Sequence, residues 1–398
     1  MDSPAGGLNM DALVDVWAKS PRTKEETEGE TLTAHTAQVL NRLASWRDRY
    51  LGLAEHCRRD DLWDLAAWAC LLHDAGKIAP GFQRMLRGGP RFGDRHEALS
   101  LIAVGWLDVA EDVRALVGAG VATHHKDLSE ILLERYPFDP PDGRTRLLSH
   151  LTDEEEVRLR AWLDGEGAPD PKAFGFARLP PLSRRSRTDA LGVSMRALAV
   201  LRQELSESTA IEPGSLAARF VRGLVVLADH AGSAHLRFGK APTLDSVTVL
   251  AKRVQADLEA RSAEPKLWPH QEACASVVGH AVLRAPTGSG KTEAALLWAA
   301  RQRESGPGLP PIFYVLPYRA SLNAMRMRIP ERYGVPETAV VLQHSSATTS
   351  LYSYLLSEKG YTSESAARSA RAAKNLGRLM TAPLRVLSPY QLLRAFFG

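Results

Sequence analysis

The chain has 398 residues, of which 44% are hydrophobic and 24% are charged, and its formal net charge is +4. This composition excludes a disordered or fibrous chain, and the length favours two domains. No stretch reaches the roughly 18 uninterrupted apolar residues of a membrane span, and no secretion signal is recognisable. Three scattered cysteines without a CxxC pair indicate a reducing compartment, so we expect a cytoplasmic protein without a membrane partner.

Residues 30 to 135 read as amphipathic helices separated by short turns. The first helix places His35 on its apolar face, which therefore points inward. The next helix ends at the doublet His73-Asp74, just before Gly76.

Two more histidine positions follow in this region. Asp94, three residues before Glu97, predicts a capped helix with His96 in its first turn. A further amphipathic segment closes on the doublet His124-His125.

The pattern weakens between 140 and 187, where proline, glycine and charged residues predict a long insertion with one short helix. Helices return at 189–206 and 214–232, the second of which contains Asp229. We therefore expect an all-α helical bundle over residues 1–245.

Residues 246–266, rich in charged and small side chains, predict a linker. After it, the apolar runs 280–286 and 311–317 alternate with helical segments, the pattern of βαβ units on a parallel sheet. The predicted fold class is thus an all-α bundle followed by an α/β domain over 267–398.

Seven histidines and aspartates lie on or beside five separate helical segments. They are His35, His73, Asp74, His96, His124, His125 and Asp229. A lone histidine on an apolar face is usually a core residue, but imidazoles and carboxylates that converge from several helices suit divalent metals. In the doublet His73-Asp74, the histidine would bind one ion while the aspartate bridges to a second. Two ions about 3.5–4 Å apart clamp both oxygens of a phosphoryl displacement, so the pattern predicts a two-metal phosphodiesterase.

Lys77 lies one helical turn beyond His73. Together with Asp74, it is our candidate catalytic residue, because its charge would neutralise the phosphate in the transition state. The alternative is a solvent-facing lysine at a helix C-terminus.

The order H…HD…H…HH…D, with Gly76-Lys77 after the doublet, resembles the HD nuclease domain of the CRISPR-associated nuclease-helicase, the signature effector of type I systems. The resemblance implies two ligand groups bridged by Asp74: His35, His73 and Asp229 for one ion, and His96, His124 and His125 for the other. It also implies single-stranded DNA as substrate and an RNA-guided type I surveillance complex as partner. The ions would be Mn, Fe, Co, Ni or Mg, because such ligands accept all of them.

Residues 280–302 place an apolar strand, a glycine-rich turn and an amphipathic helix in direct sequence. In this arrangement Gly288 and Gly290 let backbone N–H groups surround phosphate oxygens, and Lys291 reaches the outer phosphates. The turn predicts a site for ATP with Mg²⁺, formed by Thr287, Gly288, Ser289, Gly290, Lys291 and Thr292. The strict motif opens with glycine, where this chain has Ala285.

The turn APTGSGKT resembles the first motif of superfamily 2 helicases. The upstream WPHQ resembles their adenine-reading motif, which implies Gln271, and TAPLRVLSPYQLL resembles a motif in which Thr381 would touch nucleic-acid backbone. The chain would then contain the first RecA-like domain of a helicase. Because no DEAD- or DEAH-type motif follows the turn, we expect an N-terminal fragment with little ATP hydrolysis or unwinding.

Two other functions remain open at this point. An HD phosphohydrolase acting on dNTPs or cyclic nucleotides would use the same histidines but would leave the helicase-like domain without a purpose. A truncated form that only docks on nucleic acid or on a surveillance complex would leave the metal ligands unused.

Overall fold

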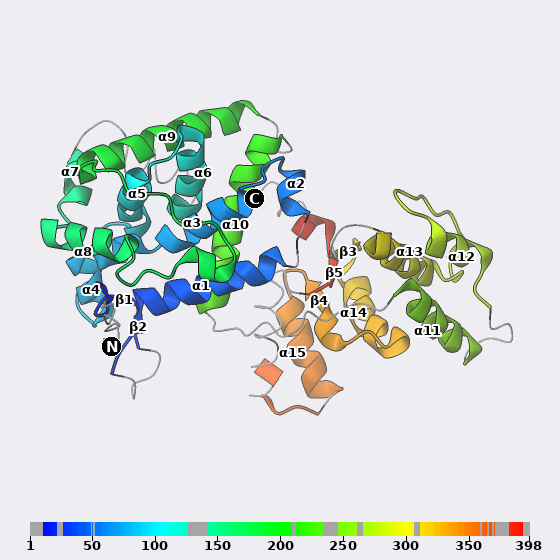
Figure 1. Ribbon diagram of the computed structural model, residues 1–398. Coiled ribbons are helices and arrows are strands. Elements are labelled where there is room, and N and C mark those ends of the chain that lie inside the picture. Colours follow the sequence, from blue (N-terminus) through cyan, green and yellow to red (C-terminus); the bar gives the residue numbers. More distant parts are fainter. Residues whose placement is uncertain are drawn as a thin grey trace, which may run out of the picture. The chain divides into compact units, whose positions relative to one another are not determined.

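The computed structural model divides the chain into two compact units, Met1–Asp48 with Gly52–Arg237, and Arg49–Leu51 with Phe238–Gly398 (Figure 1). The described residues are 11–21, 27–48, 50, 52–125, 142–208, 212–233, 246–260, 266–305, 311–358, 360–363, 366–367, 370 and 382–392. The predicted domain limits stay predictions. Across these described segments, no helix is both long and apolar enough to cross a bilayer.

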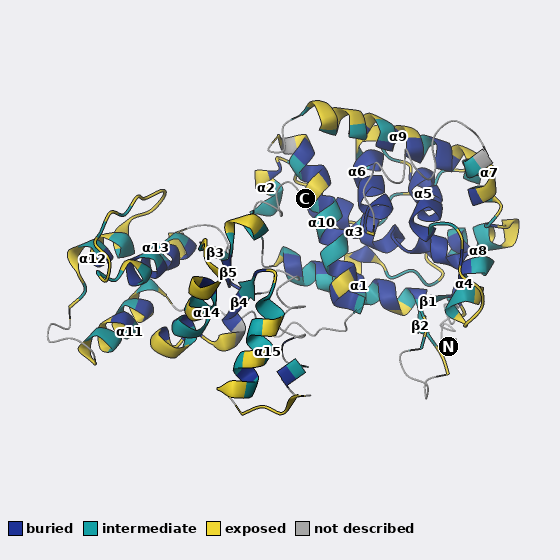
Figure 2. Cartoon of the chain, turned by 180° about the vertical axis from the view of Figure 1, so that it is seen from behind, coloured by how far each residue is buried: buried dark blue, intermediate teal, exposed yellow. Residues whose placement is uncertain are grey.

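The first unit is the expected helical bundle. Its long helices are α1 (Leu32–Arg47), α3 (Leu62–Leu72), α5 (His96–Trp106), α6 (Glu111–Ala122), α9 (Arg187–Glu207) and α10 (Pro213–Ser233). Shorter elements surround them: α2 (Leu53–His56), η1 (Ala75–Ile78), α4 (Pro80–Leu86), α7 (Asp142–Leu148), α8 (Asp153–Leu163) and η3 (Pro171–Phe174). A two-stranded antiparallel sheet of β1 (Trp17–Lys19) and β2 (Glu30–Thr31) precedes α1. Figure 2 shows that α3, α5 and α6 are buried along most of their length.

Local sequence explains how the helices begin and how closely they pack. Thr31 caps α1 by accepting a hydrogen bond from the backbone N–H of Ala34 at 3.2 Å. A Cβ atom at Gly105 of α5 would lie 1.9 Å from the backbone oxygen of Ala190 in α9. Only glycine therefore permits this close approach of two helices.

The predicted cap of α5 is wrong, although the helix does begin at His96. The N-cap residue is Arg95, and it makes no side-chain capping bond. Asp94 instead pairs with Arg146 at 2.9 Å and with His150 at 2.7 Å. The carboxylate of Asp94 therefore binds side chains from a distant segment and does not cap α5 as the local pattern had predicted.

The segment predicted as an insertion with one short helix is more ordered than expected. Its described part contains α7, α8 and η3, and it buries Leu147, Leu159 and Trp162. The indole N–H of Trp162 donates to Thr33 in α1 at 2.9 Å. The apolar residues of this segment are few and lie between charged ones, so the sequence shows little hydrophobic periodicity. They are nevertheless sufficient to pack these helices against the bundle.

The second unit has the expected α/β architecture. A parallel three-stranded sheet has the order β3 (Ile312–Val315), β5 (Leu384–Leu387), β4 (Val340–Gln343). Its helices are α11 (Val247–Glu259), α12 (Pro269–Ser276), α13 (Lys291–Ser305), α14 (Arg319–Tyr333), η4 (Glu337–Ala339) and α15 (Ala347–Ser357).

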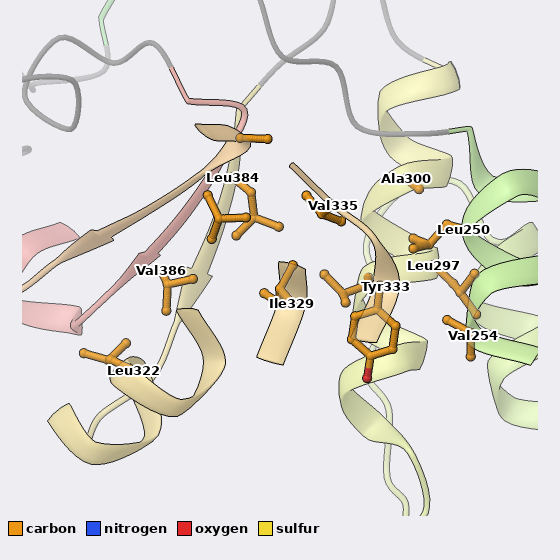
Figure 3. Packing of buried hydrophobic residues seen from close by; sticks show 13 residues of the cluster. Leu250, Val254, Leu297, Ala300, Leu322, Ile329, Tyr333, Val335, Leu384 and Val386 are labelled. Carbon is orange, nitrogen blue, oxygen red and sulfur yellow. The ribbon is translucent and has the colours of Figure 1, made fainter. Parts of the chain in front are cut away.

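One hydrophobic core connects the sheet to its helices (Figure 3). It includes Leu250 and Val254 of α11, together with Leu297 of α13 and Leu384 of β5. The predicted linker 246–266 therefore contains a packed helix. Charged residues on α11 mask this apolar face in the sequence, and the predicted linker boundaries stay a prediction.

The strand predicted before the glycine-rich turn is not formed in the described structure. Residues 277–286 have no regular structure, and Val282 is 90% exposed. The edge strand β3 leaves Phe313 and Val315 exposed on alternate positions. A β-branched run becomes a strand only when another strand pairs with its backbone, and composition alone does not supply that neighbour.

Candidate metal centre

Seven predicted ligands come from five segments of the first unit. His35 lies in α1, His73 and Asp74 follow α3, His96 begins α5, His124 and His125 follow α6, and Asp229 lies in α10. Helix ends and helix faces both contribute, so the bundle core determines where the side chains meet.

The ligand atoms form two groups. One nitrogen or oxygen from each of His35, His73 and Asp229 lies within 4.8 Å of the others, and the same holds for His96, His124 and His125. All three residues of the first group are buried. In the second group His125 is exposed, so this group is the more open to solvent. We call them the inner group and the outer group.

Asp74 lies between the two groups. Its Oδ2 atom is 3.5 Å from Nε2 of His35 and 3.4 Å from Nε2 of His73, both in the inner group. Its Oδ1 atom is 3.1 Å from Nε2 of His96 and 3.9 Å from Nε2 of His124, both in the outer group. One carboxylate thus presents one oxygen to each group.

Backbone carbonyls set the tautomers of two imidazoles. Nδ1 of His73 lies 2.7 Å from the oxygen of Cys70, and Nδ1 of His124 lies 2.7 Å from the oxygen of Val121. Because a carbonyl only accepts, each Nδ1 must carry the proton. Nε2 of each ring then faces the site, and in the neutral ring this atom carries the lone pair.

Two carboxylates stand behind the other imidazoles. Nδ1 of His35 is 3.8 Å from Glu30, and Nδ1 of His96 is 3.3 Å from Glu97. Glu97 is fully buried and accepts hydrogen bonds from Arg95. This arrangement of carboxylate behind imidazole is usual in metal sites, where it orients the ring. Neither role had a signal in the sequence beyond the adjacency of Glu97 to His96.

The residues present fit a pair of divalent cations. Several buried atoms that face the two groups make no hydrogen bond: Nε2 of His35, His73, His96 and His124, and Oδ1 of Asp74. Buried polar atoms without partners are rare in proteins because each is unfavourable. A cluster of unpaired lone pairs from imidazole and carboxylate is the donor set that borderline divalent metals require.

The protonation states also suit metal binding. Burial alone would raise the pKa of Asp74, but the charges of His73 and Lys77 outweigh it and hold that pKa well below its usual range. Burial would likewise raise the pKa of Asp229, yet the close contact with His35 and the charge of His73 lower it. Both carboxylates are therefore anionic at neutral pH.

The histidines differ from one another in the direction in which their pKa is shifted. Burial, followed by the neighbouring imidazoles, lowers the pKa of His124 well below its usual value, so this ring is neutral. Burial also lowers the pKa of His35, but the nearby carboxylates of Asp229 and Glu30 outweigh it and raise that pKa. His35 therefore attracts positive charge, which a metal ion can supply in place of a proton.

Lys77 is not the solvent-facing lysine of the alternative prediction. It is only 8% exposed, and its Nζ atom donates to Oδ2 of Asp74 at 2.7 Å and to the oxygen of Ala18 at 3.0 Å. The lysine thus holds the carboxylate that lies between the two groups.

The second unit contains the predicted phosphate loop. Gly288 and Gly290 have φ angles of 83° and 75°, which favour glycine. Lys291 donates to the backbone oxygens of Ala285 at 3.0 Å and Pro286 at 2.7 Å, so its side chain folds back over the loop.

Other residues predicted for ATP lie beside this loop. Gln271 is buried, and its side chain donates to the oxygen of Gly290 at 3.2 Å and accepts from the N–H of Trp268 at 3.0 Å. Its amide is therefore used locally, and adenine reading stays a prediction. The hydroxyl of Ser289 donates to the backbone oxygen of Pro286, Thr287 lies in the turn, and Thr292 lies in the first turn of α13. Thr381 lies outside the described residues.

Family comparisons match both units. Residues 17–238 match the model "Cas3, HD domain", which covers more than half of the chain. This chain belongs to the Cas3 family. Residues 268–387 match the model of the DEAD/DEAH box helicase. The Cas3 assignment therefore agrees with the helical unit that contains the histidine and aspartate cluster.

Individual Cas3 proteins are similar to much of the chain. A putative CRISPR-associated nuclease/helicase Cas3 from Myxococcus xanthus is 34% identical over 317 residues, which are 73% of this chain and 41% of the relative. The CRISPR-associated nuclease/helicase Cas3 of Methanothermobacter thermautotrophicus is 26% identical over 372 residues, or 82% and 40% of the two chains. The chain thus spans about two fifths of the length of these relatives. The crystal structure of T. fusca Cas3-ATP has a similar fold, with a TM-score of 0.51, 18% identity, and coverage of 97% of this chain and 44% of that one.

Proposed function

We propose that this chain is a two-metal phosphodiesterase that degrades single-stranded DNA in CRISPR antiviral defence. The observation that carries the proposal is the position of Asp74 between the inner and outer groups. Because one of its oxygens faces each group, a single side chain can bridge two ions. Bridged ions about 3.5–4 Å apart suit an in-line displacement at phosphorus.

Different residues of the chain would have different roles around the substrate. Two bound divalent ions, Mn, Fe, Co, Ni or Mg, supply the charge that stabilises the attacking and leaving oxygens. His73 and His124, whose rings are fixed by their Nδ1 contacts, would help to hold these ions through Nε2, and Lys77 holds Asp74 in place. Because His125 makes the outer group accessible, we propose that the phosphate approaches from that side.

The remaining roles follow from family membership and concern the intact protein. We propose that the loop Thr287 to Thr292 binds ATP with Mg²⁺, that Gln271 reads the adenine, and that Thr381 contacts nucleic acid. ATP-driven translocation would then feed DNA to the nuclease, and an RNA-guided type I surveillance complex would deliver it. The three cysteines are free, which supports a reducing cytoplasmic location.

The proposal is tested with the variant Asp74→Ala and circular single-stranded DNA in Mn²⁺ or Co²⁺. Loss of the bridging carboxylate is expected to abolish nicking, whereas Asp60→Ala, at an exposed position of the same unit, is expected to cut like the unmodified protein. Undiminished cleavage by Asp74→Ala would rule out the site. Faster phosphate release from dNTPs than nicking of DNA would favour a nucleotide phosphohydrolase, and protein that takes up no metal would favour a docking role.

A further inference from the structure

The second carboxylate of the centre, Asp229, is also connected to a lysine. Ser233, one helical turn further along α10, donates from its hydroxyl to Oδ1 of Asp229 at 2.9 Å. The same serine oxygen accepts a hydrogen bond from Nζ of Lys19 in β1. Oδ1 of Asp229 in turn lies 3.2 Å from Nε2 of His35. A chain of contacts therefore runs from β1 to the inner group.

The direction of these hydrogen bonds is fixed by chemistry. An ammonium group has only donors, so Ser233 must accept from Lys19. A serine hydroxyl has a single proton, and this proton is then directed at Asp229. Lys19 thereby determines which way the hydroxyl points, and the hydroxyl determines the orientation of the carboxylate.

Strand β1 supports both carboxylates. Besides providing Lys19, it provides the backbone oxygen of Ala18, which accepts from Lys77, the partner of Asp74. The strand is itself held by Gln83, whose side chain accepts from the N–H of Trp17 at 2.9 Å and donates to its oxygen at 2.8 Å.

Lys19 does not behave as an ordinary surface lysine. Its side chain is 26% exposed, and its ammonium points toward Ser233 and toward Glu30 at 3.9 Å rather than into solvent. Ordering a lysine side chain loses conformational entropy, so the contacts that it makes here must compensate for this loss. Those contacts lead to two residues of the inner group, Asp229 through Ser233 and His35 through Glu30.

We propose that Lys19 is a positioning residue of the metal centre, which acts through Ser233 to hold the carboxylate of Asp229 toward the ion of the inner group. The inference rests on the proposed two-metal function and adds to it a residue that touches neither ion. Removing either Lys19 or Ser233 would weaken one of the two ion positions and spare the other. Loss of such a supporting contact typically lowers metal affinity about 10–100-fold.

The experiment is a titration of metal-free protein with Co²⁺, followed by visible absorption and calorimetry. The unmodified protein is expected to show two binding steps. Lys19→Met and Ser233→Ala are each expected to weaken one step about 10–100-fold and to leave the other unchanged. Ser233→Thr, which keeps the hydroxyl, is expected to restore the affinity. Lys172→Met, at an exposed position of η3, is the matched control.

Different results overturn different claims. Two steps with unchanged affinities in both Lys19→Met and Ser233→Ala overturn this inference and leave the metal centre intact. Equal weakening of both steps also overturns it, because the contacts lead to one group only. Unmodified protein that binds no Co²⁺ overturns the metal centre, and the inference with it. If Lys19→Met fails to fold, as judged by circular dichroism, the comparison of Ser233→Ala with Ser233→Thr decides the question.

Discussion

Asp74 and Lys77, three residues apart, form an ion pair of 2.7 Å in which both side chains are almost completely buried. The turn η1 between them brings the lysine back over the carboxylate. Gly76 allows this turn to pack closely against α5, because a Cβ atom there would lie 2.1 Å from the backbone oxygen of His96. The same short segment therefore positions the bridging residue, its counter-charge and the start of α5.

Replacement of Lys77 by methionine is expected to lower the rate constant for DNA cleavage about 10–100-fold, the usual effect of losing a residue that orients a metal ligand. The substitution keeps the length of the side chain but leaves the buried charge of Asp74 without its cation. Single-turnover cleavage in Mn²⁺ measures the effect. A rate constant within a factor of about two of the unmodified value would show that Lys77 has no part in the reaction.

Two glycine substitutions should have opposite effects on stability. Gly105→Ala is expected to destabilise the first unit by at least about 1–3 kcal/mol, because the new methyl group would overlap the backbone of Ala190. Gly223→Ala in α10, where no atom lies within 4 Å of the new Cβ, is expected to stabilise it by about 1 kcal/mol. Chemical denaturation measures both. Similar losses in the two variants would contradict the assigned helix contact.

The second unit should respond to acid through Glu293. Burial alone would raise the pKa of this carboxyl, but hydrogen bonds from Tyr333 and the backbone and the charge of Arg328 lower it below its usual value of 4.5. The unfolded chain therefore binds the proton more tightly, and stability is lost as pH falls below about 4.5. The side chain in Glu293→Gln does not titrate, so the melting temperature of this variant should fall less between pH 5 and pH 3 than that of the unmodified protein. Parallel curves for the two proteins would contradict the assignment.

Lys291→Ala is expected to abolish binding of ATP with Mg²⁺ without affecting DNA cleavage by the separate metal centre. The side chain now bonds to the carbonyls of Ala285 and Pro286, and in the bound state it would exchange these for phosphate oxygens. Fluorescence of a labelled ATP analogue measures binding. The exposed Lys252→Ala of α11 is the control, and retained affinity in Lys291→Ala would show that the loop is not the nucleotide site.

Sequence periodicity predicted the bundle well because its helices bury one clear face. The stripe that begins at Leu32 placed His35 inward, and this side chain is fully buried. The doublet His73-Asp74 was expected at a helix end and is found directly after α3. The spacing within each helix thus carried enough information to identify which side chains point into the core.

Features that depend on distant partners were not predictable in this way. The sequence position of Asp94 resembled a helix cap. Its carboxylate instead binds Arg146 and His150, which lie more than fifty residues away in the chain. Ser233 and Lys19 gave no local signal, because their contact joins the two ends of the unit. The exposed run around Val282 shows the same limit, since a strand depends on a neighbour that composition does not specify.

The unequal solvent access of the inner and outer groups has a kinetic consequence. A cation beside the exposed His125 would exchange quickly with solvent, whereas one held by the buried His35, His73 and Asp229 would exchange more slowly and would gain from local opening of the bundle. Chelators would then strip the two positions at different speeds, leaving a half-loaded protein for a time. A different metal could then be added to the empty position. The two positions would hold different metals, so that each could be followed separately by its own spectrum.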